Sequence, residues 1–373
     1  MFPHHVYVHV PFCARRCSYC DFAIAVRARV PVDEYVAALD GELALRAGHV
    51  ARADAHVDTL YFGGGTPSRL GGEGLARAVD TVRRRVTLAA DAEVTVEANP
   101  DDVRPDAVAA WRAAGVNRLS LGGQSFDAGV LAWMHRTHDM PQIGRAVDAA
   151  RAGGIDNISL DLIFAVPDAL QRSWQNDLAH ALALGPSHVS LYGLTIEPHT
   201  PLGRWRARGE VEEADEDRYA DEFLYAHRTM VDAGFEHYEV SSFARPGRRS
   251  RHNASYWQGV PYLGLGPSAH GFDGVTRRWN AASYVEWERR VASGTDPIAG
   301  AEIIGPGERT AEDVYLGLRT TEGLALAADE LDRVGRWIDA GWATWDGERL
   351  RLTATGWLRL DALAADLTAS RSR

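Results

Sequence analysis

Short β-prone segments alternate with helical segments through the first half of the chain, and this alternation limits the folds that the sequence can adopt. Apolar residues at helical spacing fill the segments between the β-prone runs. Such alternation is typical of parallel βαβ units, so six units predict an α/β fold, either a partial, TIM-like (β/α)6 barrel or a strongly curved open sheet. The predicted strands are residues 6–10, 59–62, 93–97, 118–121, 158–163 and 188–191, and the predicted helices are residues 32–46, 74–85, 106–114, 141–152 and 173–184.

Two later regions differ in composition from the alternating part. Residues 210–222 are acidic and helix-prone, which predicts a helix with a solvated face. Residues 241–273 are rich in Gly, Pro and aromatic residues, so we expect ordered loop around short elements there.

The pattern changes again beyond about Gly305. A hairpin that turns at Asp346-Gly347 is flanked by two helical segments, and this order predicts a winged-helix-like C-terminal domain. The predicted elements are a helix over 329–341, a hairpin over 343–353 and a last helix over 355–367. The predicted domains are a core over 1–235, a connecting region over 236–300 and a C-terminal domain over 301–373.

Composition and charge restrict the function. The 373 residues include 40 basic and 51 acidic side chains, and the net charge of −11 argues against nucleic acid as the main partner. The chain lacks a run of about 18 to 20 apolar residues and a basic, apolar secretory leader, so we expect a cytoplasmic protein. Its three cysteines do not make the pairs of a disulfide framework.

Cys13, Cys17 and Cys20 lie directly after the first predicted strand. In a [4Fe–4S] cubane each iron takes one ligand besides its sulfides, so a Cx3Cx2C loop leaves one iron open. The amino and carboxylate groups of S-adenosylmethionine (SAM) can chelate that iron, and an electron from the cluster can then cleave the S–C5′ bond to give a 5′-deoxyadenosyl radical. The alternative is structural zinc, which needs a fourth ligand such as His9 and usually uses paired Cx2–4C knuckles.

Polar or glycine-rich residues follow the next four predicted strands. In parallel α/β folds the loops at the carboxyl ends of the strands carry the chemistry, so these residues should line one pocket. Asp161 lies on an otherwise apolar strand, where a buried charge without a partner is costly. The segments are Gly63-Gly64-Gly65-Thr66-Pro67, Glu97 in Glu-Ala-Asn-Pro, Gln124 in Gly-Gly-Gln-Ser-Phe with Arg136 twelve residues later, and Asp161 in Leu-Asp-Leu-Ile-Phe.

The cysteine loop resembles the signature of the radical SAM superfamily, and the segments together resemble the oxygen-independent coproporphyrinogen III oxidases and their relatives. The resemblance runs from Tyr7 to the C-terminus and implies a [4Fe–4S] cluster on the three cysteines. The residues that it implies for contacts with SAM or with the cluster region are Tyr7, Tyr19, Gly64, Gly65, Thr66, Glu97, Gln124, Arg136 and Asp161.

Two features resemble the heme chaperones of that family more than its decarboxylating oxidases. The oxidases carry Cx3Cx2CxC, whereas Phe22 stands here in place of the fourth cysteine. The heme chaperones of the family have an HNxxYW segment that is associated with heme binding. A similar segment is present here as His252-Asn253-Ala-Ser-Tyr256-Trp257. The sequence departs from the family at Pro267-Ser268, where a Cys-Gly or Ala-Gly pair is common.

The HNxxYW resemblance implies a heme site on His252, Asn253, Tyr256 and Trp257. A neutral imidazole can ligate heme iron, and the two aromatic side chains can lie against the porphyrin face. His252 is not the sole choice of axial ligand, because His270, His4 and His5 are also available.

The resemblance implies a heme chaperone that delivers heme to respiratory heme proteins, as a cluster-dependent homodimer with some peripheral association with the inner face of the cell membrane. The alternative is a radical enzyme of porphyrin biosynthesis that decarboxylates coproporphyrinogen III, or a related methyl transferase. A third hypothesis, nucleic-acid modification through the C-terminal tail, is disfavoured by the acidic charge. Whether SAM is cleaved or only bound, and therefore whether the chain is an enzyme, stays open at this point.

Overall fold

Six parallel strands form the centre of the sheet in the computed structural model, which describes residues 2–47 and 54–371. Neighbouring strands pair in chain order, and each lies parallel to the next. The strands are β1 (His5–Val10), β4 (His56–Gly64), β5 (Thr87–Ala98), β6 (Arg118–Gln124), β7 (Asn157–Phe164) and β8 (His188–Gly193). The six predicted strands are therefore confirmed, and with them the α/β class of the core.

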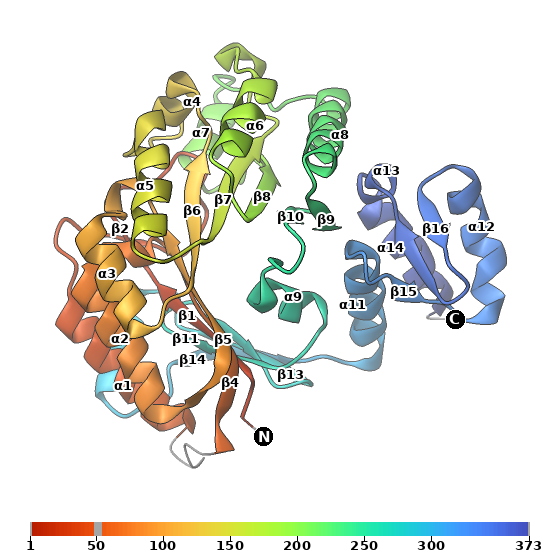
Figure 1. Cartoon of the computed structure of the whole chain (residues 1–373). Coiled ribbons are helices and arrows are strands. Elements are labelled where there is room, and N and C mark those ends of the chain that lie inside the picture. Colours follow the sequence, from red (N-terminus) through yellow and green to blue (C-terminus); the bar gives the residue numbers. More distant parts are fainter. Residues whose placement is uncertain (1, 48–53, 372–373) are drawn as a thin grey trace.

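Helices connect these strands and cover the outer face of the sheet (Figure 1). The five predicted helices are present with ends within three residues of the prediction. They are α1 (Val32–Ala47), α2 (Gly71–Arg85), α3 (Pro105–Ala114), α5 (Met140–Ala152) and α6 (Trp174–Ala183). A short helix, α4 (Ala128–Trp133), precedes α5, and the loop between them carries Arg136.

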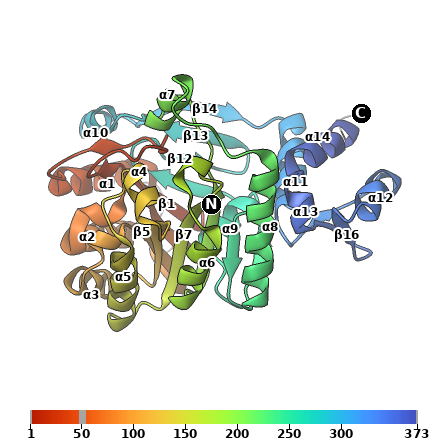
Figure 2. The ribbon, with the colours of Figure 1, turned by 90° about the horizontal axis from the view of Figure 1, so that it is seen from above.

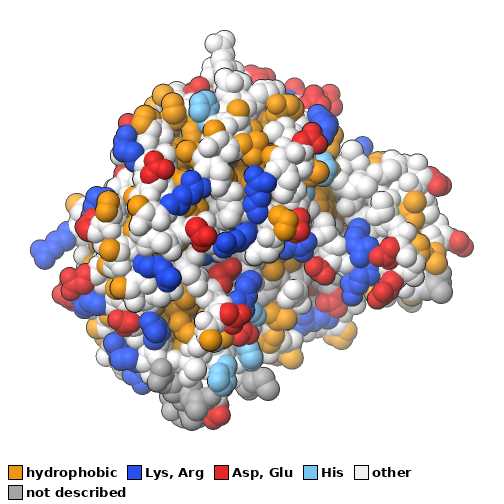
Figure 3. Space-filling model, viewed as in Figure 1, with side chains coloured by type: hydrophobic (Ala, Val, Ile, Leu, Met, Phe, Trp, Pro, Cys, Tyr) orange, Lys and Arg blue, Asp and Glu red, His pale blue; other side chains and the backbone are white. Residues whose placement is uncertain are grey.

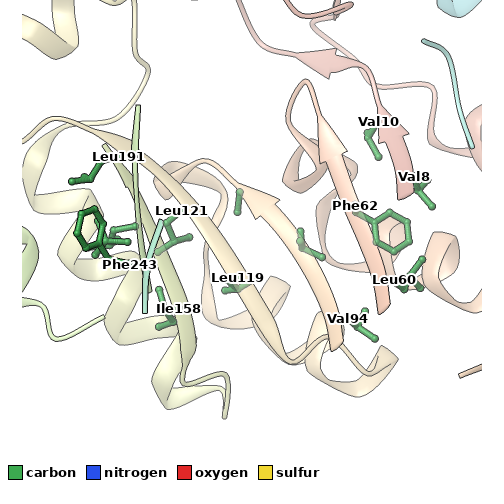
Figure 4. Close-up of a cluster of buried hydrophobic side chains, with 14 of the residues drawn as sticks. Val8, Val10, Leu60, Phe62, Val94, Leu119, Leu121, Ile158, Leu191 and Phe243 are labelled. Carbon is green, nitrogen blue, oxygen red and sulfur yellow. The ribbon is translucent and has the colours of Figure 1, made fainter. Parts of the chain in front are cut away.

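The main core lies between the parallel strands and these helices. Figure 4 shows Val8, Phe62, Val94, Leu119 and Ile158 on successive strands, and all five side chains are buried. Strands of a parallel sheet covered by helices are nearly continuous apolar runs, which is why they could be recognised in the sequence. Each such side chain contributes roughly 1.5–3 kcal/mol when it is fully buried.

The chain after the sixth unit extends the sheet at both edges. At one edge β10 (Ser242–Ala244) pairs antiparallel with β8 and with β9 (Glu236–Glu239). At the other edge β11 (Tyr262–Leu265) lies parallel to β1. Three antiparallel strands follow, β12 (His270–Phe272), β13 (Thr276–Asn280) and β14 (Ile298–Ile303). The region over 241–273 thus consists of short strands and one helix, α9 (Arg251–Trp257).

The helix predicted over 210–222 is wrong in its position. The structure has α8 (Glu216–Asp232), which follows α7 (Pro201–Ala207) after an irregular segment. Asp215 caps α8 by accepting a hydrogen bond from the Arg218 N–H, so the residues before it lie outside the helix. The helix continues past the acidic run because Phe223, Ala226 and Met230 form its buried face.

The C-terminal residues form helices around a small antiparallel sheet at one side of the core (Figure 2). The predicted hairpin is confirmed, since the Asp346 carboxylate accepts the N–H groups of Glu348 and Arg349 and Gly347 has a φ of 100°. The elements are α11 (Pro306–Arg319), β15 (Leu324–Ala325), α12 (Leu331–Asp339), β16 (Ala343–Trp345), β17 (Arg349–Leu352), α13 (Ala354–Trp357) and α14 (Leu360–Arg371).

The single last helix predicted over 355–367 is wrong, because the structure divides it into α13 and α14. Trp357 ends α13 and is held from outside the helix. Its indole N–H donates to the Leu318 carbonyl at 3.1 Å, and its ring lies 4.5 Å from the His237 ring between centroids. These contacts join α13 to α11 and β9, so the break follows from tertiary packing.

Charged side chains of both signs are interspersed over the face shown in Figure 3, with scattered apolar side chains between them. Within residues 2–47 and 54–371, we find no helix that combines the length and the apolar character needed to cross a bilayer.

Glu42 joins the first helix to the strands that return beside β1. Its buried carboxylate accepts hydrogen bonds from the Gly266 N–H at 2.8 Å, the Trp287 indole at 2.8 Å and the Asn280 amide at 2.7 Å. Arg46 lies 3.2 Å from the same carboxylate. Glu42 therefore holds the segment after β11, β13 and helix α10 (Tyr284–Ala292) against α1.

We expect Glu42→Ala to lower the free energy of unfolding by about 3 kcal/mol or more, because it leaves buried donors and Arg46 without their acceptor. Glu286→Ala is the matched control, since Glu286 pairs with Arg289 and Arg290 at the surface of α10 and its loss should cost much less. Urea denaturation of the cluster-free protein measures both. Equal losses for the two variants would contradict the role given to Glu42.

Candidate functional site

Two contiguous cavities lie where the parallel strands end. The smaller cavity has a volume of about 360 Å3 and the larger about 1110 Å3. Phe22, Gly64 and Glu97 line both of them. In parallel α/β folds the carboxyl ends of the strands are the usual place for binding and catalysis, so these cavities form the candidate site.

All three cysteines line the smaller cavity. Cys13 ends β2 (Phe12–Cys13), which pairs with β3 (Ala25–Val26) and closes the base of the cysteine loop. The Arg136 guanidinium donates a hydrogen bond of 3.5 Å to the sulfur of Cys17. Burial raises the pKa of Cys20 to about 11, so ligation by this thiol must release its proton.

His9, the fourth ligand considered for zinc, is committed to other partners. Its Nε2 lies 3.0 Å from the Ala23 carbonyl oxygen, and its Nδ1 lies 3.2 Å from the Tyr7 hydroxyl. Over residues 2–47 and 54–371, no group of three His, Cys, Asp or Glu side chains is arranged to hold a single metal ion. The donor set at the loop, three thiols with an arginine beside them, fits a cluster ligated at three irons.

Eight of the nine residues expected to contact SAM or the cluster region line the smaller cavity with the cysteines. They are Tyr19, Gly64, Gly65, Thr66, Glu97, Gln124, Arg136 and Asp161. The ninth, Tyr7, lines the larger cavity.

The two glycines after β4 allow the strand end to approach the cysteine loop. Gly64 has a φ of 112°, and a Cβ there would lie 2.5 Å from the His9 ring. A Cβ on Gly65 would lie 2.6 Å from the carbonyl oxygen of Pro11 and 3.1 Å from the sulfur of Cys13. A larger residue at either position would push the cysteine loop away from the strand ends.

Glu97 is a partly buried carboxylate with two donors. It accepts a hydrogen bond of 2.8 Å from the Tyr61 hydroxyl and one of 3.1 Å from the Gly64 N–H. Burial raises its pKa to about 7, and the nearby Asp161 carboxylate adds to this shift. Oxygen atoms of Glu97 thus remain able to accept further hydrogen bonds at the junction of the two cavities.

Asp161 has the partners that a charge on an apolar strand requires. It accepts hydrogen bonds from the hydroxyls of Ser120 at 2.9 Å and Ser159 at 3.2 Å. Burial still raises its pKa above the usual value. The serines lie on neighbouring parallel strands, so their convergence depends on register, which the sequence alone did not reveal.

Asn99 and Tyr192 are among the lining residues that were missed from the sequence. Asn99 accepts a hydrogen bond of 2.6 Å from Arg136 and so fixes the guanidinium, whose Nε is buried without a partner among the described residues. Tyr192 lines the smaller cavity near the end of β8. The available signals were the Glu-Ala-Asn-Pro segment for Asn99 and the polar end of the sixth strand for Tyr192.

His252, expected as a heme ligand, is completely buried and lies outside both sets of cavity-lining residues. Its Nδ1 lies 2.7 Å from the Thr59 hydroxyl and its Nε2 lies 2.9 Å from the Tyr256 hydroxyl. Its ring stacks on Tyr61 with centroids 4.9 Å apart. Burial lowers the pKa of His252 to about 3, so the imidazole is neutral.

The other residues of the HNxxYW segment divide between two places. Tyr256 and Trp257 line the larger cavity, and the Arg319 guanidinium lies 4.0 Å above the Trp257 ring. Asn253 is not among the lining residues, and its backbone N–H donates to the Ser250 hydroxyl at the start of α9. Ser268, which stands where the family often has glycine, has a left-handed φ of 61° and lines the larger cavity.

The larger cavity lies between the sheet and the C-terminal helices. Its walls are mainly aromatic and apolar, as expected of a site for a hydrophobic ligand. Tyr262 and Phe272 line it from β11 and β12, and Tyr315 and Leu316 line it from α11. Ala365 lines it from α14. A ligand in this cavity would therefore contact elements that are far apart in the sequence.

Comparisons with known proteins agree with this arrangement. The model of the radical SAM superfamily matches residues 7–178. The structure of coproporphyrinogen III oxidase (HemN) from Escherichia coli, a radical SAM enzyme, covers 98% of this chain and 89% of its own, with a TM-score of 0.81 and 23% identity. This likeness shows the fold alone.

Curated relatives are closer in sequence. The heme chaperone HemW of Mycobacterium tuberculosis is 42% identical over 372 residues, covering 98% of this chain and 95% of its own. HemW of Bacillus subtilis is 34% identical over 86% of this chain and 84% of its own, and HemW of Escherichia coli is 41% identical over 72% of this chain and 70% of its own. The chain therefore belongs to the HemW family of heme chaperones, within the radical SAM superfamily.

Proposed function

We propose that this chain is a heme chaperone that binds heme in the larger cavity and passes it to respiratory heme proteins. The observation that carries the proposal is the larger cavity itself, whose aromatic walls adjoin the site proposed for SAM. The names of the relatives support heme as the cargo. Phe22 adds support, because it lines both cavities at the position where the oxidases have a fourth cysteine.

We also propose that the smaller cavity holds a [4Fe–4S] cluster on Cys13, Cys17 and Cys20 with SAM beside it, as membership of the superfamily implies. The cluster would supply the electron for reductive cleavage of SAM. Arg136 would balance the charge of the thiolates, and Glu97 would accept hydrogen bonds from the ribose hydroxyls. Gly64 and Gly65 would let the ligand approach the backbone.

Heme-accepting respiratory proteins, a cluster-dependent homodimer and peripheral contact with a membrane surface are further parts of this proposal. Their support is the family resemblance.

A second candidate function is a radical enzyme acting on a porphyrinogen. The contiguity of the two cavities favours it, because a tetrapyrrole in the larger cavity would adjoin the SAM site. Anaerobic conversion of coproporphyrinogen to protoporphyrinogen, with 5′-deoxyadenosine and methionine as co-products, would favour this candidate over the chaperone.

We expect Cys20→Ala to prevent cluster assembly, because two thiolates cannot hold a cubane that needs three. Anaerobic reconstitution followed by iron and sulfide analysis should give about four irons per chain for the original protein and less than one for the variant. Asp21→Asn, an exposed change in the same loop, is the control and should assemble the cluster normally. Uptake of zinc without iron or sulfide would contradict the assignment.

We expect SAM to bind more tightly as the pH rises from 6 to 8, because the pKa of Glu97, raised to about 7, leaves its carboxylate mostly protonated at pH 6 and mostly charged at pH 8. Glu97→Gln should weaken SAM binding about tenfold at pH 8 and flatten this part of the pH profile. Equilibrium dialysis of the two reconstituted proteins measures the Kd of SAM across this pH range. The SAM amino group titrates in the same way with either protein, so it does not account for a difference between their profiles.

The same substitution should stabilise the ligand-free fold at pH 8. Because the pKa of Glu97 in the folded protein lies above its ordinary value of 4.5, the free energy of unfolding falls as the pH rises from about 4.5 to about 7. Gln cannot ionise, so it removes this penalty of about 1–3 kcal/mol. An unchanged pH profile of SAM binding in Glu97→Gln would contradict the role of this carboxylate.

We expect Ala365→Trp to weaken hemin binding at least tenfold, because the indole would fill part of the larger cavity. Ala362→Trp is the matched control, since Ala362 is exposed on the same helix but does not line the cavity. Hemin titration followed by the Soret difference spectrum measures both. Absence of a Soret band in the original protein, or equal binding by the two variants, would defeat the proposed site.

A further inference from the structure

Heme iron in the larger cavity needs an axial ligand, and a neutral imidazole with an uncommitted ring nitrogen supplies one. Of the histidines that the structure describes, His9 and His270 line this cavity. His9 engages both ring nitrogens, one with Tyr7 and one with Ala23, and its side chain is buried. His270 is therefore the cavity histidine to consider.

His252 is poorly placed to ligate heme iron in the larger cavity. To reach iron it would have to break its hydrogen bond with Thr59 or with Tyr256, and each such loss leaves a buried polar group unsatisfied. Tyr256 also lies between this imidazole and the cavity, because its hydroxyl holds the histidine while the tyrosine itself lines the cavity. The geometry gives His252 the role of fixing Tyr256 in the cavity wall.

The imidazole of His270 is exposed and uncommitted. Among the described residues, none makes a hydrogen bond with its ring, which leaves both nitrogens available. Partial burial lowers the pKa of His270, and the nearby Arg277 guanidinium lowers it further. The ring is therefore neutral near pH 7, the form that ligates metal.

A row of cross-strand neighbours holds the His270 ring in place. His270 on β12 lies opposite Trp279 on β13, and Trp279 lies opposite Gly300 on β14. The His270 and Trp279 rings stack with centroids 5.9 Å apart and an interplanar angle of 27°. A Cβ on Gly300 would lie 2.4 Å from the indole, so glycine there lets the indole lie across β14 and support the imidazole.

The backbone of His270 is fixed from the opposite side. A Cβ on Gly264 would lie 1.8 Å from the His270 carbonyl oxygen, so this glycine permits the close contact of β11 with β12. Tyr262 on β11 and Phe272 on β12 line the cavity beside it, and Tyr256 meets Tyr262 edge to face at 4.7 Å. A flat, apolar macrocycle would find aromatic walls next to the imidazole.

We propose that His270 is the axial ligand to heme iron in the larger cavity, whereas His252 is a positioning residue for Tyr256. This inference rests on the proposed function, and it names the residue that would take the iron.

The test is hemin titration of the full-length, cluster-reconstituted protein, combined with near-infrared magnetic circular dichroism of the ferric heme. We expect His270→Ala to raise the hemin Kd at least tenfold and to abolish the imidazole-ligation signature, and added imidazole should restore that signature. His270→Met should still bind hemin but show a thioether signature, which a merely structural residue would not produce. His199→Ala, an exposed histidine outside both cavities, should behave as the original protein.

The outcomes separate this inference from the function on which it rests. Unchanged imidazole ligation in His270→Ala, with its loss in His252→Ala, would overturn the assignment of His270 while leaving heme binding intact. Hemin binding by the original protein that Ala365→Trp blocks would support the cavity whichever histidine ligates. No hemin binding by the original protein would overturn both proposals.

Discussion

The close approach of the β4 turn to the cysteine loop is the contact on which the candidate site depends. Gly65 lies against the Pro11 carbonyl and the sulfur of Cys13, and Gly64 lies against His9 in a conformation that favours glycine. With side chains at these positions, the three thiols would be pushed away from the strand ends that carry Glu97 and Gln124. Cluster ligands and SAM-contacting residues can share one cavity because the backbone leaves this space.

A continuous series of contacts joins the two cavities. Glu97 accepts a hydrogen bond from the Tyr61 hydroxyl, Tyr61 stacks on His252, and His252 hydrogen-bonds to Tyr256 in the wall of the larger cavity. Every member is buried or partly buried, so a displacement of one side chain shifts the side chains packed against it. The HNxxYW segment therefore also has a structural function in this fold, because His252 joins Tyr61 to Tyr256. This function explains why its histidine is buried while its aromatic residues line the cavity.

The sequence predicted the parts of the fold and site that depend on local pattern. Six apolar strands, the helices between them and the polar residues at strand ends were all visible, because buried parallel strands read as short apolar runs. The break between α13 and α14 was not visible, since Leu318 and His237, which hold Trp357, lie far away in the sequence. The burial of His252 was missed for the same reason: its partner Thr59 is 193 residues away. Motif resemblance identified the segment, but only tertiary contacts reveal which of its side chains face the cavity.

Two glutamates show how the fold separates structure from function. Glu42 is enclosed by donors from Gly266, Asn280 and Trp287 as well as Arg46, so its acceptor capacity is used within the protein. Glu97 is only partly buried and has two donors, so it keeps acceptor capacity at the junction of the cavities. Burial raises the pKa of both carboxylates. Burial of a carboxylate with unused acceptor capacity lowers the stability of the fold. A ligand that donates hydrogen bonds to this carboxylate offsets the cost, so such a residue is expected at a binding site. By this argument Glu42 belongs to the framework and Glu97 to the site, although both are glutamates inside the same sheet-and-helix core.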